Sequence, residues 1–270
     1  MVFTKVVFTV NSEEQSNMLL AQLLTMGFDG FEESDSQLLA YIESNQFDEP
    51  AVRSLAEELR VGYKAESVPS QNWNEVWESN FSPVVVEGFC TIRADFHDIK
   101  VATPYEIVIT PKMSFGTGHH ATTQLMLLMM KDLPMKDLSV LDFGTGTGVL
   151  AIMAELLGAA SITAIDKDDW CVENAEENIA RNNCKKIIVK KGSLEIADSY
   201  NLILANINRH ILLQYMPTLA EKLTPGGLII MSGLLVDDRE IITTSAGSNG
   251  FQSTGYMEQN GWISLSFIKY

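Results

Sequence analysis

The sequence has no apolar run that approaches the roughly 20 residues needed to span a bilayer. Residues 1–5, Met-Val-Phe-Thr-Lys, lack the basic start and the long apolar stretch of a secretory signal peptide. Cysteine is scarce: Cys90, Cys171 and Cys184 are scattered and form no Cys-x-x-Cys pair, which gives no zinc cluster and suits a reducing compartment. We therefore expect a cytoplasmic protein.

Basic residues are also in the minority, with 19 Lys and Arg against 35 Asp and Glu, so the formal net charge is −16. A surface of this sign repels nucleic-acid phosphates, and direct nucleic-acid binding is not expected. Two interpretations of the charge remain open. The acidic surface attracts a basic protein or peptide, or the charge serves solubility alone.

Residues 1–68 are predicted to form a compact α+β domain, and a chain of 270 residues has room for a second one. After a strand-like start, Ser12 with Gln15 three residues on resembles a capping box, and Gly27 ends the apolar helix that follows. Two short strands, a helix over about 50–59 and a closing strand complete the order βαββαβ. This order is that of the ferredoxin-like motif.

Residues 69–83 are predicted to be a connector, helical in conformation. Trp73, Trp77 and Phe81 follow one another at steps of four, which would place three aromatic side chains on one helical face. Two interpretations of this face are open. It packs against one of the domains, or it belongs to a hinge and also lines the substrate entrance.

Residues 84–270 show a different pattern, in which strands alternate with helices after two strand-like pieces and a strand near residues 107–110. The alternation predicts an α/β domain with a mainly parallel, doubly wound sheet. Two last strands, 251–257 and 262–268, flank a turn, so an antiparallel hairpin is expected at the edge of the sheet. The five candidate strands are Ser139–Phe143, Ile162–Asp166, Ile187–Lys190, Leu202–Asn206 and Leu228–Ser232, and helices begin near Val149, Trp170 and Ile211.

The strongest motif is the segment Asp142–Gly148, Asp-Phe-Gly-Thr-Gly-Thr-Gly, which leads from an apolar strand into a helix. Glycine has no side chain, so such a turn lets a ligand approach the backbone closely. Asp166 ends the next strand, 22 residues after Gly144, where a carboxylate can accept hydrogen bonds from both ribose hydroxyls of an adenosine. The sequence therefore predicts an adenosine-containing cofactor bound by Gly144, Thr145, Gly146 and Asp166.

The spacing of the glycines separates two such cofactors, NAD and S-adenosylmethionine. The loop follows G-x-G-x-G, whereas the dinucleotide fingerprint is G-x-G-x-x-G, and an acid, Asp142, precedes it. Both details resemble the first motif of class I methyltransferases. Asp142 is expected to orient the loop or approach the methionine ammonium of S-adenosylmethionine, or else only to cap neighbouring backbone amides.

The fourth candidate strand ends in Asn206-Ile207-Asn208. In class I methyltransferases this strand end borders the transferring methyl group, and enzymes that methylate planar nitrogens commonly have Asn-Pro-Pro-Tyr there. This chain keeps the asparagine without the prolines or the aromatic residue, which favours an amine over a flat amide or base as the acceptor. Asn206 is therefore the candidate catalytic residue and also a candidate cofactor ligand, with a simple strand-end turn as the alternative.

A second motif, Phe115-Gly116-Thr117-Gly118, lies upstream and leads through two histidines into another helix. Glycines followed by hydroxyls at a helix start can form a nest for a carboxylate, here the methionine end of the cofactor. His119 and His120 do not predict a metal site, because adjacent histidines point in different directions and no third ligand is evident.

Taken together, these motifs resemble the ribosomal protein L11 methyltransferases (PrmA) over nearly the whole chain. The resemblance implies a Rossmann-like methyltransferase domain preceded by a ferredoxin-like domain that docks the ribosomal substrate. It further implies S-adenosylmethionine as the cofactor, and methylation of lysine side chains and of the N-terminal α-amino group of ribosomal protein L11. We expect a monomer that acts on the free protein before ribosome assembly. The segments that carry the resemblance are 73–83, 115–118, 120–123, 142–148, 206–207 and 232–235, and in the family the cofactor is held by residues that match Thr123, Gly144, Asp166 and Asn206.

The chain departs from this family where Asp-Pro-Gly usually precedes the Phe-Gly-Thr-Gly segment, since it has Thr110-Pro111-Lys112, and it has Ala121 where proline is frequent. Two other functions stay open at this point. An NAD-dependent oxidoreductase would share the glycine turn and Asp166. A non-catalytic module would bind the ribosomal protein without modifying it.

Overall fold

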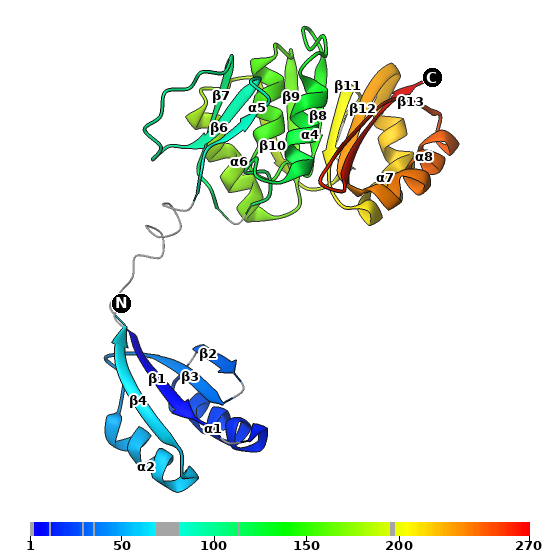
Figure 1. Ribbon diagram of the computed structural model, residues 1–270. Coiled ribbons are helices and arrows are strands. Elements are labelled where there is room, and N and C mark those ends of the chain that lie inside the picture. Colours follow the sequence, from blue (N-terminus) through cyan, green and yellow to red (C-terminus); the bar gives the residue numbers. More distant parts are fainter. Residues whose placement is uncertain are drawn as a thin grey trace. The chain divides into compact units, whose positions relative to one another are not determined.

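The computed structural model describes residues 3–10, 12–28, 30–34, 36–68, 81–112, 114–194 and 198–270. These residues belong to two compact units, Met1–Asn80 and Phe81–Tyr270, each of which is described by itself below (Figure 1). Most of the predicted connector, including Trp73 and Trp77, lies outside the described residues. In the part of the chain that is described, no helix is long and apolar enough to cross a membrane.

The first unit is one antiparallel sheet with two helices, in the element order predicted from the sequence. The strands lie in the order β2-β3-β1-β4, and a core that includes Phe8, Leu19 and Val52 holds the helices against them. The Ser12 half of the predicted capping box is confirmed, because the side chain of Ser12 accepts a hydrogen bond from the backbone N–H of Gln15, while the side-chain amide of Gln15 donates to the carbonyl of Leu59. The elements are β1 (Phe3–Thr9), α1 (Glu13–Thr25), β2 (Gly30–Ser34), β3 (Gln37–Glu43), α2 (Glu49–Leu59) and β4 (Gly62–Val68).

The second unit contains a seven-stranded sheet in the order β10-β9-β8-β11-β12-β14-β13. The first five strands in this order are parallel, and β14 and β13 add the predicted antiparallel hairpin at one edge. The strands are β8 (Ser139–Phe143), β9 (Ser161–Asp166), β10 (Ile187–Lys191), β11 (Tyr200–Asn206), β12 (Leu223–Leu235), β13 (Phe251–Gln259) and β14 (Trp262–Lys269). The mainly parallel sheet predicted from the sequence is thus confirmed.

Helices cover both faces of this sheet, as a doubly wound fold requires. Successive residues of β8 alternate between two cores: Val140 packs with the helices α4, α5 and α6, whereas Leu141 packs with α7 and α8. The helices are α4 (Ala121–Met130), α5 (Val149–Leu156), α6 (Asp169–Arg181), α7 (Arg209–Lys222) and α8 (Arg239–Ser248). The sequence patterns did not predict α8.

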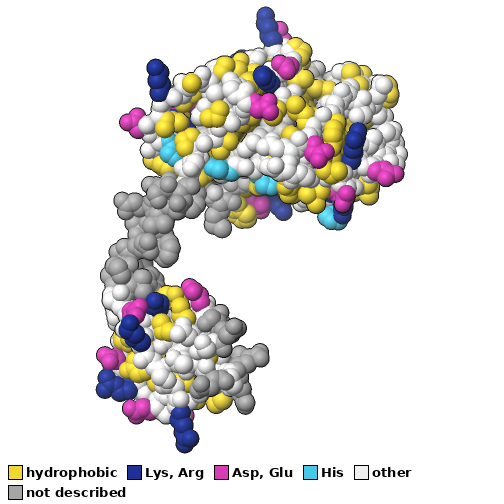
Figure 2. Space-filling model, in the orientation of Figure 1, with side chains coloured by type: hydrophobic (Ala, Val, Ile, Leu, Met, Phe, Trp, Pro, Cys, Tyr) yellow, Lys and Arg dark blue, Asp and Glu magenta, His cyan; other side chains and the backbone are white. Residues whose placement is uncertain are grey.

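The strand-like pieces before residue 110 do not join the large sheet, which the sequence could not show. They form a separate three-stranded sheet, in which β5 (Val84–Val86) pairs antiparallel with β6 (Cys90–Ala94) and β6 pairs parallel with β7 (Tyr105–Ile109). On the face of the molecule shown in Figure 2, the basic side chains of the second unit stand apart from one another rather than gathering into one patch.

Candidate active site

A cavity of about 530 Å³ opens at the carboxyl ends of β8, β9 and β11, and Gly144, Asp166 and Asn206 are among the residues that line it. From β8 the chain continues to β9 and β10 on one side, and it then returns to β11 on the other side. Ligands of doubly wound sheets bind at such a reversal of strand order, beyond the carboxyl ends of the strands. The cavity also has the size of a small-molecule site.

The glycine-rich loop Gly144–Gly148 forms one wall of the cavity, and backbone hydrogen bonds fix its course. The N–H groups of Gly144 and Thr145 donate to the carbonyl of Ile165 at 2.9 and 3.0 Å. The N–H of Gly146 donates to Oδ2 of Asp166 at 3.0 Å, and the other carboxylate oxygen accepts from the backbone N–H of Asp168 at 3.2 Å. Asp166 therefore anchors the loop as well as facing the cavity.

Asp142 is fully buried beneath this loop and is not among the residues that line the cavity. Its Oδ2 accepts a hydrogen bond from Oγ1 of Thr145 at 2.6 Å and from the N–H of Ala151 at 3.2 Å, while Oδ1 has no partner among the described residues. Burial raises the pKa of Asp142 to about 7, although both hydrogen bonds act in the opposite direction. These contacts support two of the roles considered for Asp142, the orientation of the loop through Thr145 and the capping of a backbone amide at Ala151.

The Phe115–Gly118 segment interlocks with the glycine-rich loop through Thr147. The N–H of Thr147 donates to the carbonyl of Phe115 at 2.9 Å, and its Oγ1 donates to the carbonyl of Gly116 at 2.8 Å. A Cβ on Gly116 would lie 2.7 Å from that Oγ1, and the φ of Gly116 is +105°. Glycine is therefore required there by the neighbouring loop.

Aromatic rings form another wall of the cavity. Phe115, His120 and Trp262 all line it. The centroid of the His120 ring lies 4.6 Å from the ring centroid of Trp262 and 5.3 Å from that of Phe115. His120 also caps α4, since its Nδ1 accepts from the N–H of Thr122 at 3.3 Å. His119 instead packs edge-on against Phe81, at 4.7 Å between ring centroids.

Asn206 reaches the cavity at the end of β11. Its Nδ2 donates to Oγ1 of Thr123 at 3.5 Å, and its Oδ1 is buried without a partner among the described residues. A buried amide oxygen without a donor costs free energy, so a ligand group that donates to it would bind favourably. Of the predicted site residues, Gly144, Gly146, Asp166 and Asn206 line the cavity. Thr123 and Thr145 are not among the lining residues: Thr123 contacts Asn206, and Thr145 contacts the buried Asp142.

Other parts of the cavity wall were not singled out from the sequence. Trp262 begins β14 and reaches the cavity only because that strand pairs with the far end of β12, at Leu235. Asp166, Asp168 and Cys171 bring potential metal-ligating atoms within 4.8 Å of one another, but both oxygens of Asp166 already accept backbone hydrogen bonds. No motif in the sequence signals either arrangement.

Comparisons of this chain with family models, with curated proteins and with solved structures all lead to proteins of the same description. The family model described as ribosomal protein L11 methyltransferase (PrmA) matches residues 7–270. A protein of that name from Phocaeicola vulgatus is 38% identical over 279 residues, covering 99% of each chain, and one from Porphyromonas gingivalis is 40% identical over 264 residues, covering 94% of this chain and 91% of the relative. The crystal structure of a ribosomal protein L11 methylase from Lactobacillus delbrueckii subsp. bulgaricus is 33% identical, with a TM-score of 0.66, and covers 70% of this chain and 100% of its own.

Proposed function

Because the chain belongs to the ribosomal protein L11 methyltransferase family, we propose that it methylates amines of ribosomal protein L11 with S-adenosylmethionine as the methyl donor. The acceptors proposed are lysine side chains and the N-terminal α-amino group. The names of the matched proteins favour this cofactor over NAD, and an interlocked glycine-rich loop beside a cavity favours an enzyme over a non-catalytic module.

The residues around the cavity fit this cofactor. Asp166 offers a carboxylate to the ribose hydroxyls, Gly144 and Gly146 leave the backbone of the loop open to a ligand, and Thr145 holds the loop to Asp142. Thr123 holds the amide of Asn206, whose buried Oδ1 lacks a donor. The position of Asn206 in the cavity wall, at the end of β11, is the observation that carries the proposal, because its amide can then contact the cofactor ammonium or the acceptor amine.

When bound, S-adenosylmethionine supplies a methyl group on a positively charged sulfur. The acceptor must arrive as a neutral amine, because an ammonium has no lone pair, and lysine with a pKa near 10.4 is mostly charged at neutral pH. The amide of Asn206 does not titrate, so its proposed task is to hold the amine in line while water takes the proton. Such alignment contributes up to about 7–11 kcal/mol to rate acceleration in well-oriented reactions.

The N-terminal unit is proposed to select the substrate. It has a core of its own, and the residues that line the cavity all belong to the second unit. The proposed recognition domain is 1–68. The proposed role of the connector 69–83 is to let several amines of one substrate reach a single cavity. The net charge of −16 supports a free, basic protein partner rather than nucleic acid, and we propose that the enzyme acts as a monomer in the cytoplasm.

The test is methyl transfer to purified ribosomal protein L11, followed by intact-mass and peptide mass spectrometry. Wild-type protein should add methyl groups to lysine and N-terminal amines. The variant Asn206→Leu should lose about ten- to a hundredfold in kcat/KM, because the hydrogen bonds that hold the amine are gone. The matched control is Asn249→Leu, at a half-buried asparagine that donates to the carbonyl of Ser245 and is not among the residues that line the cavity, and its kcat/KM should stay at the wild-type value. Absence of transfer by the wild-type protein would overturn the proposal.

A further inference from the structure

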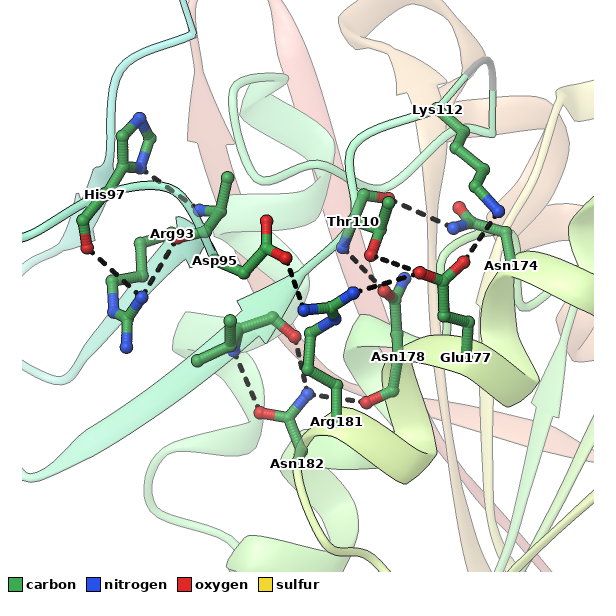
Figure 3. A network of polar contacts seen from close by, with 12 residues as sticks. Arg93, Asp95, His97, Thr110, Lys112, Asn174, Glu177, Asn178, Arg181 and Asn182 are labelled. Atoms are coloured by element: carbon green, nitrogen blue, oxygen red, sulfur yellow. Dashed lines mark hydrogen bonds and ion pairs between the residues drawn. The ribbon is translucent and has the colours of Figure 1, made fainter. Parts of the chain in front are cut away.

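The outer edge of β7 is paired with side chains instead of with another strand. Val108 donates its N–H to Oδ1 of Asn182 at 2.9 Å and accepts from Nδ2 of the same residue at 2.6 Å. Two residues further along, Thr110 donates its N–H to Oδ1 of Asn178 at 2.7 Å and accepts from Nδ2 of Asn174 at 3.0 Å (Figure 3). We refer to Asn174, Asn178 and Asn182 as the asparagine ladder.

The spacing of the ladder matches the geometry of the strand. Its members recur every four residues along α6 and its C-cap, a rise of about 6 Å in a helix. Two residues of a strand rise about 6.6 Å, which is the step from Val108 to Thr110. One face of α6 can therefore follow the backbone of β7 as a neighbouring strand would.

Asn178 differs from the other two members because it also reaches the cofactor loop. It is fully buried, and its Nδ2 donates to the carbonyl of Thr147 at 2.8 Å. Thr147 is the residue whose N–H and Oγ1 bond to Phe115 and Gly116. The amide of Asn178 thus connects the backbone at Thr110 with the glycine-rich loop.

An ion-pair cluster on the same helix holds the segment that leaves β7. Glu177 accepts from Oγ1 of Thr110 at 2.7 Å, from Nζ of Lys112 at 2.6 Å and from Arg181 at 3.0 Å (Figure 3). The hydrogen bonds from Lys112 and Thr110 lower the pKa of Glu177 to about 2, so it is ionised at neutral pH. Thr110 and Lys112, two of the residues that depart from the family pattern, are therefore both bound by α6.

We propose that Asn178 is a positioning residue for cofactor binding, which sets the glycine-rich loop by holding the carbonyl of Thr147 at a fixed distance from β7. The inference rests on the proposed function, since it takes the ligand of that loop to be S-adenosylmethionine. Asn182 and Asn174 bond to the backbone groups of Val108 and Thr110 along the edge of β7. Glu177 holds Thr110 and Lys112, which begin the segment that leads to Phe115.

The test compares Asn178→Asp with Asn182→Asp in the full-length chain. Each substitution replaces an amide donor of the ladder by a carboxylate oxygen, but Asn178 has the bond to the cofactor loop. Calorimetry with S-adenosylhomocysteine should give a Kd at least about tenfold higher for Asn178→Asp, because the buried carbonyl of Thr147 loses its donor and faces a negative charge. The Kd of Asn182→Asp should stay within about twofold of wild type, while thermal denaturation shows the cost of disturbing the edge in both.

A purely structural role would give a different result, in which both variants lose thermal stability and their Kd values agree. Steady-state kinetics adds a second readout: KM for S-adenosylmethionine should rise in Asn178→Asp while kcat at saturating cofactor changes little. If Asn178→Asp does not fold, Asn178→Ser admits water between Thr110 and Thr147 and should still raise the Kd. Wild-type protein that fails to bind S-adenosylhomocysteine overturns the proposed function. Binding by wild type with equal Kd values in the variants overturns the positioning role alone.

Discussion

The carbonyl oxygen of Phe115 lies only 2.2 Å from the place where a Cβ on Gly146 would stand, so the two loops meet backbone to backbone. Gly146 also has a φ of +56° and lines the cavity. The requirement for glycine at this position has two causes, close approach and a left-handed backbone, and neither can be relieved by moving a flexible side chain.

Replacing Gly146 with alanine should therefore abolish detectable cofactor binding and lower the free energy of unfolding. The matched control is Gly250→Ala, since Gly250 has a φ of +84° but no atom within 4 Å of an added Cβ. The free energy of unfolding of the control should fall by only about 1–2 kcal/mol, the cost of a left-handed backbone for alanine, and the control should bind the cofactor normally. Chemical denaturation and calorimetry measure the two effects. Equal losses of stability, with binding intact in both, would contradict the interlocking of the loops.

Replacing Asp166 with asparagine should weaken cofactor binding about ten- to a hundredfold, because charge-assisted hydrogen bonds contribute about 1.5–3 kcal/mol. The substitution affects the ligand and also the bond from the N–H of Gly146. Asp169→Asn is the control: this acid is the first residue of α6, is largely exposed and pairs with Lys191. Titration calorimetry should find wild-type affinity in the control. An unchanged Kd in folded Asp166→Asn would remove the ribose assignment.

Asp142 should make the protein less stable as the pH rises. Its carboxyl releases a proton near pH 3.8 in the unfolded chain, but only near pH 7 in the folded protein. Between these values folding requires proton uptake, so the stability that Asp142 contributes falls as pH rises and is constant above 7. The variant Asp142→Asn cannot titrate, and its stability relative to wild type should increase between pH 4 and 7 by at most about 4 kcal/mol. Denaturant unfolding at a series of pH values tests this, and a constant difference would show that the carboxyl is ionised throughout.

Removing residues 1–80 should leave S-adenosylmethionine affinity within a few-fold of wild type, because the described residues that line the cavity belong to the second unit. Activity on intact ribosomal protein L11 should collapse, since the proposed selector is absent. Activity on short lysine peptides, which do not need the selector, provides the internal control. A truncated enzyme that methylates the intact protein at the full rate and at the same positions would show that the N-terminal unit is not the selector.

Local patterns predicted most of the large sheet. The strand Ser139–Phe143 has the predicted bounds, because an apolar run followed by glycine leaves little choice of where a strand ends. The helix α8 was missed because serine, threonine and glycine make up half of its ten residues, so its apolar spacing is weak. The separate sheet of β5, β6 and β7 depends on pairing between strands, which no local pattern encodes.

The candidate site was likewise predicted only in part from the sequence. Gly144, Gly146, Asp166 and Asn206 were predicted from strand ends and glycine spacing, and all four line the cavity. Trp262 and the asparagine ladder could not be predicted, because each depends on elements far apart in the sequence. Asparagines at four-residue intervals on a helix are expected to face solvent, and only the neighbouring strand edge gives them another role.

The asparagine ladder has a consequence for how the molecule behaves among its own copies. An edge strand with free N–H and C=O groups is a template for a strand from another chain, and proteins usually guard such edges with lysine, proline or bulges. Along Val108 to Thr110 the backbone groups that face α6 are already occupied by amide side chains of the same molecule. Intermolecular sheet extension is therefore blocked at this edge, and the protection against aggregation is provided by a helix.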